Sequence, residues 1–136
     1  SMDGLRVVFQ TKTGPVVGVE NLSFSIFPGE TVCLVGESGS GKSVSSLALM
    51  RLIEYSGGNI DSGKVLFYSD SEKGKNLIGE TQNNMRKIRG NEIGMVFQET
   101  MTALNPVFTI SRQLTEGLRI HQGLNKIAAD KEALEL

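Results

Sequence analysis

The sequence predicts an α/β protein with antiparallel strands at the N-terminus, a partial core built on a buried strand, and the start of a helical subdomain at the C-terminus. Three observations support this fold class. Apolar residues alternate with others near the N-terminus; an apolar run at 31–36 leads through a glycine-rich loop into helical spacing; and two helical patterns close the chain.

The composition is that of an ordinary globular chain of about one domain. Of 136 residues, 39% are hydrophobic and 21% charged, and the net charge is −1, which gives no electrostatic reason to expect a nucleic-acid partner. No apolar run approaches the roughly 18 residues that span a bilayer, and no signal peptide opens the chain. Residues 1–2 resemble a remnant of tag removal and are set apart from the fold.

The first half of the chain predicts three strands. Residues 5–10 and 22–27 alternate as half-buried strands do, with a turn at 11–15 between the first and the second. The continuous apolar run at 31–36 predicts a strand buried on both faces of a parallel sheet. Its Cys33, the chain's single cysteine, is expected to be a small buried hydrophobe.

The remaining patterns alternate between helix and strand. Helical spacing covers 42–54, and breaks or polar loops are expected at 56–63, 70–84 and 99–106. The expected strands are 64–69 and 92–98. A short helix or turn is expected at 85–90, and longer helices at 111–122 and 125–136.

The loop between the strand at 31–36 and the helix at 42–54 fits the pattern G-x-x-x-x-G-K-[ST]. Small residues there let successive backbone N–H groups form an anion nest beside the N-terminus of the helix. Gly39 and Gly41 are expected at positive φ, Lys42 can reach phosphate oxygens, and Ser43 can ligate magnesium. The predicted phosphate-binding residues are Gly36, Glu37, Ser38, Gly39, Ser40, Gly41, Lys42, Ser43 and Val44.

A second motif narrows the class. The segment "MVFQETMTALNP" (95–106) resembles the Q-loop of ATP-binding cassette ATPases, and "VGESGSGKSVSSLALMRLI" (35–53) resembles their phosphate loop. Together they resemble the oligopeptide and dipeptide importer branch of that family, over nearly all of residues 5–136. The resemblance implies a P-loop NTPase-type core, with ATP and Mg as cofactors.

The family's roles carry over to matching positions. The resemblance implies that Lys42 and Gln98 are catalytic, and that Ser43 and Gln98 contact Mg. No aromatic residue stands at the commonest place for adenine stacking, because Thr13 precedes Gly14 there. Phe9 is the nearest candidate, and an ordinary place in a strand explains it equally well.

Two departures limit the resemblance. Thr100 replaces the proline usual after the Q-loop, and the LSGGQ-like signature, the strand ending in Asp-Glu and the switch histidine are not found in these 136 residues. His121 lies on a helical pattern and is expected to pack rather than to catalyse. The chain thus resembles the N-terminal half of one nucleotide-binding domain, with a partial ATP-binding core at 3–98 and the Q-loop and first helical subdomain residues at 99–136.

The function implied is an ATP-binding subunit that powers import of peptides or related solutes from the cytoplasmic face of the cell membrane. The implied partners are permease subunits at the Q-loop, a second ATPase subunit and a separate solute-binding protein. These residues alone are expected to bind nucleotide weakly, to hydrolyse it negligibly and to self-associate. The alternatives are a small-molecule kinase, a non-transport cassette ATPase, or a GTPase, whose N-K-x-D motif "NKIA" (125–128) only begins to match.

Overall fold

The computed structural model describes residues 1–69, 74–99 and 104–135. The chain forms two compact units, Ser1–Met85 and Arg86–Leu136.

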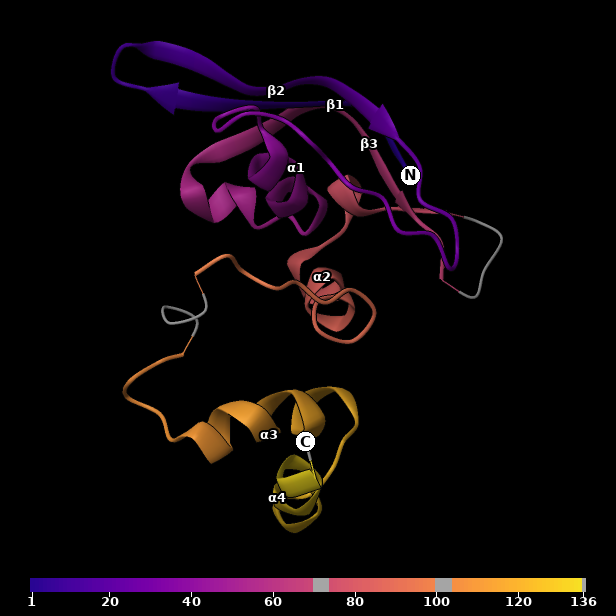
Figure 1. Cartoon of the computed structure of the whole chain (residues 1–136), viewed down its shortest axis with the longest axis vertical. Coiled ribbons are helices and arrows are strands. Elements are labelled where there is room, and N and C mark those ends of the chain that lie inside the picture. The colour runs from indigo at the N-terminus through magenta and orange to yellow at the C-terminus, as the bar shows by residue number, and fades with distance from the viewer. Residues whose placement is uncertain (70–73, 100–103, 136) are drawn as a thin grey trace. The chain divides into compact units, whose positions relative to one another are not determined.

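A four-stranded antiparallel sheet forms the frame of the first unit (Figure 1). Its strands are β1 (Met2–Thr11), β2 (Gly14–Phe24), β3 (Gly58–Phe67) and β4 (Lys75–Asn76), in the order β2-β1-β3-β4. A tight turn joins β1 to β2, and the Thr11 hydroxyl donates a hydrogen bond of 2.6 Å to the Gly14 carbonyl across it. The expected antiparallel N-terminal strands and the strand at 5–10 are therefore confirmed. Residues 1–2, expected to stand apart from the fold, instead take part in it, because Met2 begins β1 and is buried.

One helix lies against this sheet, below the β1–β2 hairpin in Figure 1. Helix α1 (Lys42–Leu49) begins where the glycine loop predicts, buries Ser45 and Ala48, and is followed by the short 3-10 helix η1 (Ile53–Ser56). The helix expected over 42–54 is thus correct at its start and too long at its end. Apolar burial between helix and strands stabilises the arrangement; the buried apolar side chains of the unit include Leu5, Val7, Val19, Ile53, Val65, Leu77 and Met85.

The second unit is helical. Helix α2 (Gln82–Ile88) crosses the boundary between the units, and α3 (Ile110–His121) and α4 (Lys126–Glu135) pack side by side. The side chain of Thr109 caps α3 by accepting a hydrogen bond of 3.3 Å from the Arg112 backbone N–H. The helices expected at 85–90, 111–122 and 125–136 are confirmed within a few residues.

Two expected strands are wrong. Residues 31–36 and 92–98 lie in no strand, and the nearest parallel pairing is an isolated bridge between Arg89 and Ile93. A strand buried on both faces needs a parallel neighbour and covering helices. The described part of the chain offers 31–36 no such strand, so Val35 is 91% exposed and Cys33 is exposed rather than buried.

Three boundaries also differ from the sequence-based expectation. The segment 56–63 is not a break, because β3 already begins at Gly58. The segment 70–84, expected as one loop, holds β4, the 3-10 helix η2 (Leu77–Gly79) and the start of α2, while 70–73 lie outside the described residues. The strand expected at 22–27 is instead β2, which already begins at Gly14 and ends at Phe24, because its pairing with β1 sets both limits.

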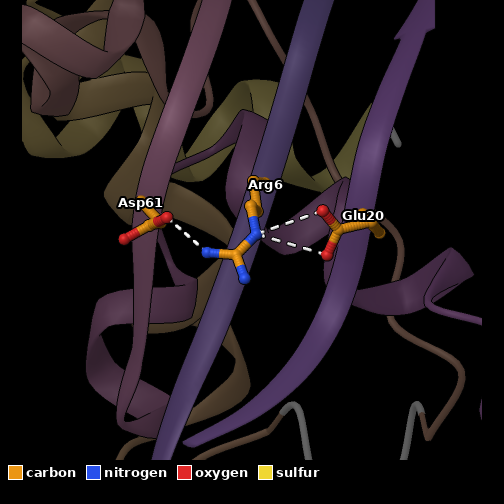
Figure 2. Close-up of polar contacts among 3 residues, drawn as sticks. All are labelled: Arg6, Glu20 and Asp61. Carbon is orange, nitrogen blue, oxygen red and sulfur yellow. Dashed lines mark hydrogen bonds and ion pairs between the residues drawn. The ribbon is translucent and has the colours of Figure 1, made fainter.

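An ion-pair cluster crosses three strands of the sheet (Figure 2). The Arg6 guanidinium on β1 bonds Glu20 on β2 at 3.2 Å and Asp61 on β3. Arg6 lies at irregularities in the register of β1 with both neighbours, where ladder pairing shifts. The hydrogen bonds to Asp61 and Glu20 raise the pKa of Arg6 above its usual value.

Candidate phosphate-binding site

The glycine loop is curled rather than extended. Gly39 and Gly41 have φ of +82° and +87°, a conformation that glycine adopts without steric cost, and the Ser40 N–H donates a hydrogen bond of 3.2 Å to the Glu37 carbonyl. Helix α1 follows at once, with no side-chain cap and no acidic residue in its first turn. The positive end of its dipole and its first backbone N–H groups are therefore left to a ligand.

The ammonium group of Lys42 holds the loop in this shape. Its Nζ atom lies 2.6 Å from the carbonyl oxygens of both Gly36 and Glu37, and 3.1 Å from the Ser40 hydroxyl. We call this arrangement the lysine clasp. The clasp uses all three donors of the ammonium. The positive charge of Lys42 is therefore held beside residues 36–40 by oxygen atoms of the loop itself.

Close packing against the sheet fixes the point where the loop enters α1. A Cβ atom at Gly41 would lie 2.5 Å from the Gly18 carbonyl oxygen of β2, far inside contact distance. The buried Ser45 hydroxyl donates a hydrogen bond of 2.8 Å to the Gly41 carbonyl. The positive φ of Gly41 and its close approach to β2 together explain why only glycine fits there.

The structure thus brings residues 36–44 together as one site, with residues 36–40 exposed and the Ser43 side chain exposed on α1. Gln98 is also exposed, but it belongs to the second unit and lies outside any helix or strand. Thr100 lies outside the described residues. The catalytic, adenine and magnesium roles assigned from the sequence remain predictions.

Phe9 lies on β1 with its ring beside two glycines of the neighbouring strands. A Cβ atom at Gly18 would lie 2.7 Å from Phe9 Cε2, and one at Gly58 would lie 3.0 Å from Cε1. Val44 of α1 approaches the same point at Gly18 to 3.4 Å. The ring therefore has a packing role between sheet and helix, whether or not it also contacts a base.

Two other sequence features have structural explanations. Asn125, the start of the GTPase-like "NKIA", caps α4, because its side chain accepts a hydrogen bond of 2.9 Å from the Ala128 N–H. His121 is half-buried at the end of α3, and its Nε2 lies 3.1 Å from the place a Cβ of Gly90 would take. Asn125 therefore has a helix-capping role, and His121 packs as expected.

Sequence reasoning missed the residues that support the loop from outside. Gly18 is the clearest, because glycine inside an otherwise apolar strand signals close backbone approach, and that signal was present in "PVVGVE". The carbonyls of the lysine clasp gave no comparable signal, since every residue carries one. Of the described residues, no group of three His, Cys, Asp or Glu side chains could hold a metal ion, and none of the described helices is long and apolar enough to cross a membrane.

A curled glycine loop, entering a helix packed against a sheet and carrying a lysine at its mouth, defines a nucleotide-binding protein of the P-loop class. Comparison with known proteins makes this specific. The family model described as ABC transporter matches residues 19–135, so the chain belongs to the ABC transporter family. Its α/β fold is that of a P-loop NTPase.

The three relatives that follow are named as import ATP-binding proteins. The chain is 49% identical over 135 residues to a peptide import ATP-binding protein of Brucella abortus (strain 2308), covering 99% of this chain and 40% of that protein. It is 50% identical over 133 residues to a peptide import ATP-binding protein of Brucella melitensis, covering 98% and 39%. It is 47% identical over 132 residues to a glutathione import ATP-binding protein of Pectobacterium atrosepticum, covering 97% and 21%. The chain therefore spans about two-fifths or less of the length of these relatives.

Proposed function

We propose that this chain supplies the phosphate-binding part of an ATPase that powers import of peptides or related small solutes across the cytoplasmic membrane. The single observation that carries the proposal is the lysine clasp at the N-terminus of α1, on a curled loop of the P-loop pattern. The names of the peptide and glutathione import relatives support the choice of solute class.

The clasp suggests how the loop receives a nucleotide. Of the three oxygens around Lys42 Nζ, the Ser40 hydroxyl is the most distant, at 3.1 Å. A phosphate oxygen can replace the neutral hydroxyl oxygen as acceptor and form an ion pair with the ammonium, while both carbonyl contacts persist. Because the loop is already curled, little conformational entropy is lost when phosphate binds.

Magnesium fits the donor set. Mg²⁺ prefers oxygen ligands and is usually held by one or two protein groups together with substrate phosphates. The Ser43 hydroxyl, exposed beside the loop, would supply one such oxygen. The family resemblance implies Gln98 as a further ligand. Bound there, the ion would neutralise phosphate charge, which is its usual contribution to phosphoryl transfer.

We extend the proposal to partners and domains as the resemblance implies them. Permease subunits would dock near the Q-loop, and a second ATPase subunit and a solute-binding protein would complete the system at the cytoplasmic face of the membrane. Residues 3–98 would form the ATP-binding core, and residues 99–136 the Q-loop and the first part of the helical subdomain.

Calorimetric titration of the chain with Mg·ATP tests the proposal. We expect weak but saturable binding, and a loss of about tenfold to a hundredfold in affinity for Lys42→Ala, because a charged hydrogen-bond donor is removed. Lys87→Ala is the matched control, since Lys87 is an exposed lysine of α2 outside the loop. Equal affinities for Lys42→Ala and the wild-type chain would contradict the proposal.

Turnover provides a separate measurement. Hydrolysis requires a group that orients the attacking water in addition to a phosphate cradle. We expect the 136-residue chain to hydrolyse ATP no faster than Lys42→Ala in a steady-state phosphate-release assay. A rate clearly above that variant would show that these residues contain a complete catalytic set.

A further inference from the structure

The C-terminal end of α1 carries an arginine where a glycine is usual. The Arg51 N–H donates to the Ala48 carbonyl at 2.9 Å, and the Leu52 N–H donates to the Leu47 carbonyl at 2.8 Å. These two bonds form a Schellman motif, in which the residue after the cap takes a left-handed conformation. That residue is Arg51, with φ of +50°, which is disfavoured for a side chain with a Cβ atom.

The side chain of Arg51 compensates through well-placed partners. Its Nε and Nη2 atoms each lie 2.9 Å from Glu54 Oε1 in η1, and its Nη1 donates to the Glu80 backbone carbonyl. The side chain is only 13% exposed. A planar guanidinium with several donors can make such a set of bonds, whereas a lysine ammonium cannot match its fork geometry.

The partners of Arg51 are themselves tied to α2. Gln82 Nε2 donates to Glu54 Oε2 at 3.3 Å, and Asn84 Nδ2 donates to Glu80 Oε2 at 2.6 Å. The guanidinium therefore links the end of α1 to η1 and to the residues that begin α2, all within the first unit. The opposite end of α1 carries Lys42 and Ser43.

We propose that Arg51 is a positioning residue for the nucleotide site, an inference that rests on the proposed function. By anchoring the far end of the eight-residue helix α1, it fixes the axis along which Lys42, Ser43 and the first N–H groups face the phosphates. Arg51 lies at the opposite end of α1 from the loop, so its effect on affinity passes through the placement of the helix.

The decisive variant is Arg51→Gly, because glycine adopts the left-handed conformation freely and keeps the backbone cap while it removes the guanidinium. We expect faster hydrogen exchange at the amides of α1 than in the wild-type chain. We also expect Mg·ATP affinity to fall by about threefold to tenfold, a modest loss typical of misplaced rather than deleted ligands. Arg51→Lys should restore part of the affinity, since it retains the charge.

Arg6→Gln is the matched control, because it removes an arginine of the same unit that lies on the sheet and is held by the carboxylates of Glu20 and Asp61. Its Mg·ATP affinity should stay within about twofold of the wild-type value. If Arg51→Gly fails to fold, Glu54→Gln provides a second test, because it removes the charge of the Arg51 partner and preserves its shape. Mg·ATP affinity should also fall in Glu54→Gln. Unchanged α1 exchange or unchanged affinity in folded Arg51→Gly would overturn the inference.

The two proposals fail in different ways. A wild-type chain that gives no heat with Mg·ATP contradicts the proposed function, and α1 exchange in Arg51→Gly then decides alone whether Arg51 holds the helix. The other outcome is that the wild-type chain binds Mg·ATP in a Lys42-dependent way and Arg51→Gly binds it equally well. That result overturns only the positioning role.

Discussion

At the residue scale, two different properties of glycine are needed in the loop: its freedom to adopt positive φ and its lack of a Cβ atom. Gly39 and Gly41 both have positive φ, as the sequence predicts from the phosphate-loop pattern. Space around them differs: a Cβ at Gly39 meets nothing within 4 Å, whereas one at Gly41 would meet the Gly18 carbonyl oxygen at 2.5 Å. The motif indicates the conformation but not the neighbour, because β2 reaches this point only through the fold.

This difference predicts unequal costs for matched substitutions. Gly39→Ala should lower the free energy of unfolding by about 1 kcal/mol, the cost of left-handed backbone alone. Gly41→Ala should cost more than about 2 kcal/mol, since the loop must also move away from β2. Urea denaturation of the two variants measures both values, and equal losses would show that the loop does not pack on Gly18.

At the element scale, the positions of the helices are predicted better than their buried faces. Helices α3 and α4 form where the spacing predicts them, and α1 starts at the lysine of the motif, but Ile127 and Leu134 of α4 are 84% and 88% exposed. The run at 31–36 was assigned to a buried strand because it is apolar, yet a strand is defined by pairing with a partner. Periodicity within one segment carries no information about that partner.

The sheet itself predicts a salt-dependent stability at Arg6. Arg6→Gln breaks bonds to two neighbouring strands at the point where register shifts, so we expect a thermal midpoint lower by a few degrees at low salt. The difference should shrink at about 1 M salt, where the Debye length is roughly 3 Å. Thermal unfolding followed by circular dichroism measures it, and a salt-independent difference would assign the effect to packing.

The pH response of this cluster has a definite sign. Because its partners raise the pKa of Arg6, its contribution is fully present below the unfolded-state value and lost only above the folded-state value. Both lie far above neutral pH for an arginine. The stability lost in Arg6→Gln should therefore be the same at pH 7 and pH 9.

At the scale of the whole molecule, apolar side chains are exposed between the sheet and the loop. Ile26, Phe27, Val32, Leu34 and Val35 are all at least 39% exposed. A patch of this kind favours association with another apolar surface. The apolar run at 31–36 predicts a buried strand in this segment, and contact with a second copy of the chain would bury the same residues.

We therefore expect the chain to self-associate, with a mass that rises with concentration in light scattering up to about 100 µM. Val35→Ser should reduce the association, because Val35 is the most exposed of these side chains, at 91%. Val107→Ser in the second unit is a matched control, since Val107 is 82% exposed but outside this segment. A constant monomer mass across the range would contradict the expectation.

The lysine clasp also makes trypsin cleavage after Lys42 a measure of local opening of the loop. Trypsin must take a lysine side chain into its specificity pocket, and Lys42 Nζ is already bound by Gly36, Glu37 and Ser40. Scission of the Lys42–Ser43 peptide bond thus requires the clasp to release and the first turn of α1 to fray. The rate of cleavage after Lys42 in a digest therefore measures how frequently the lysine clasp opens.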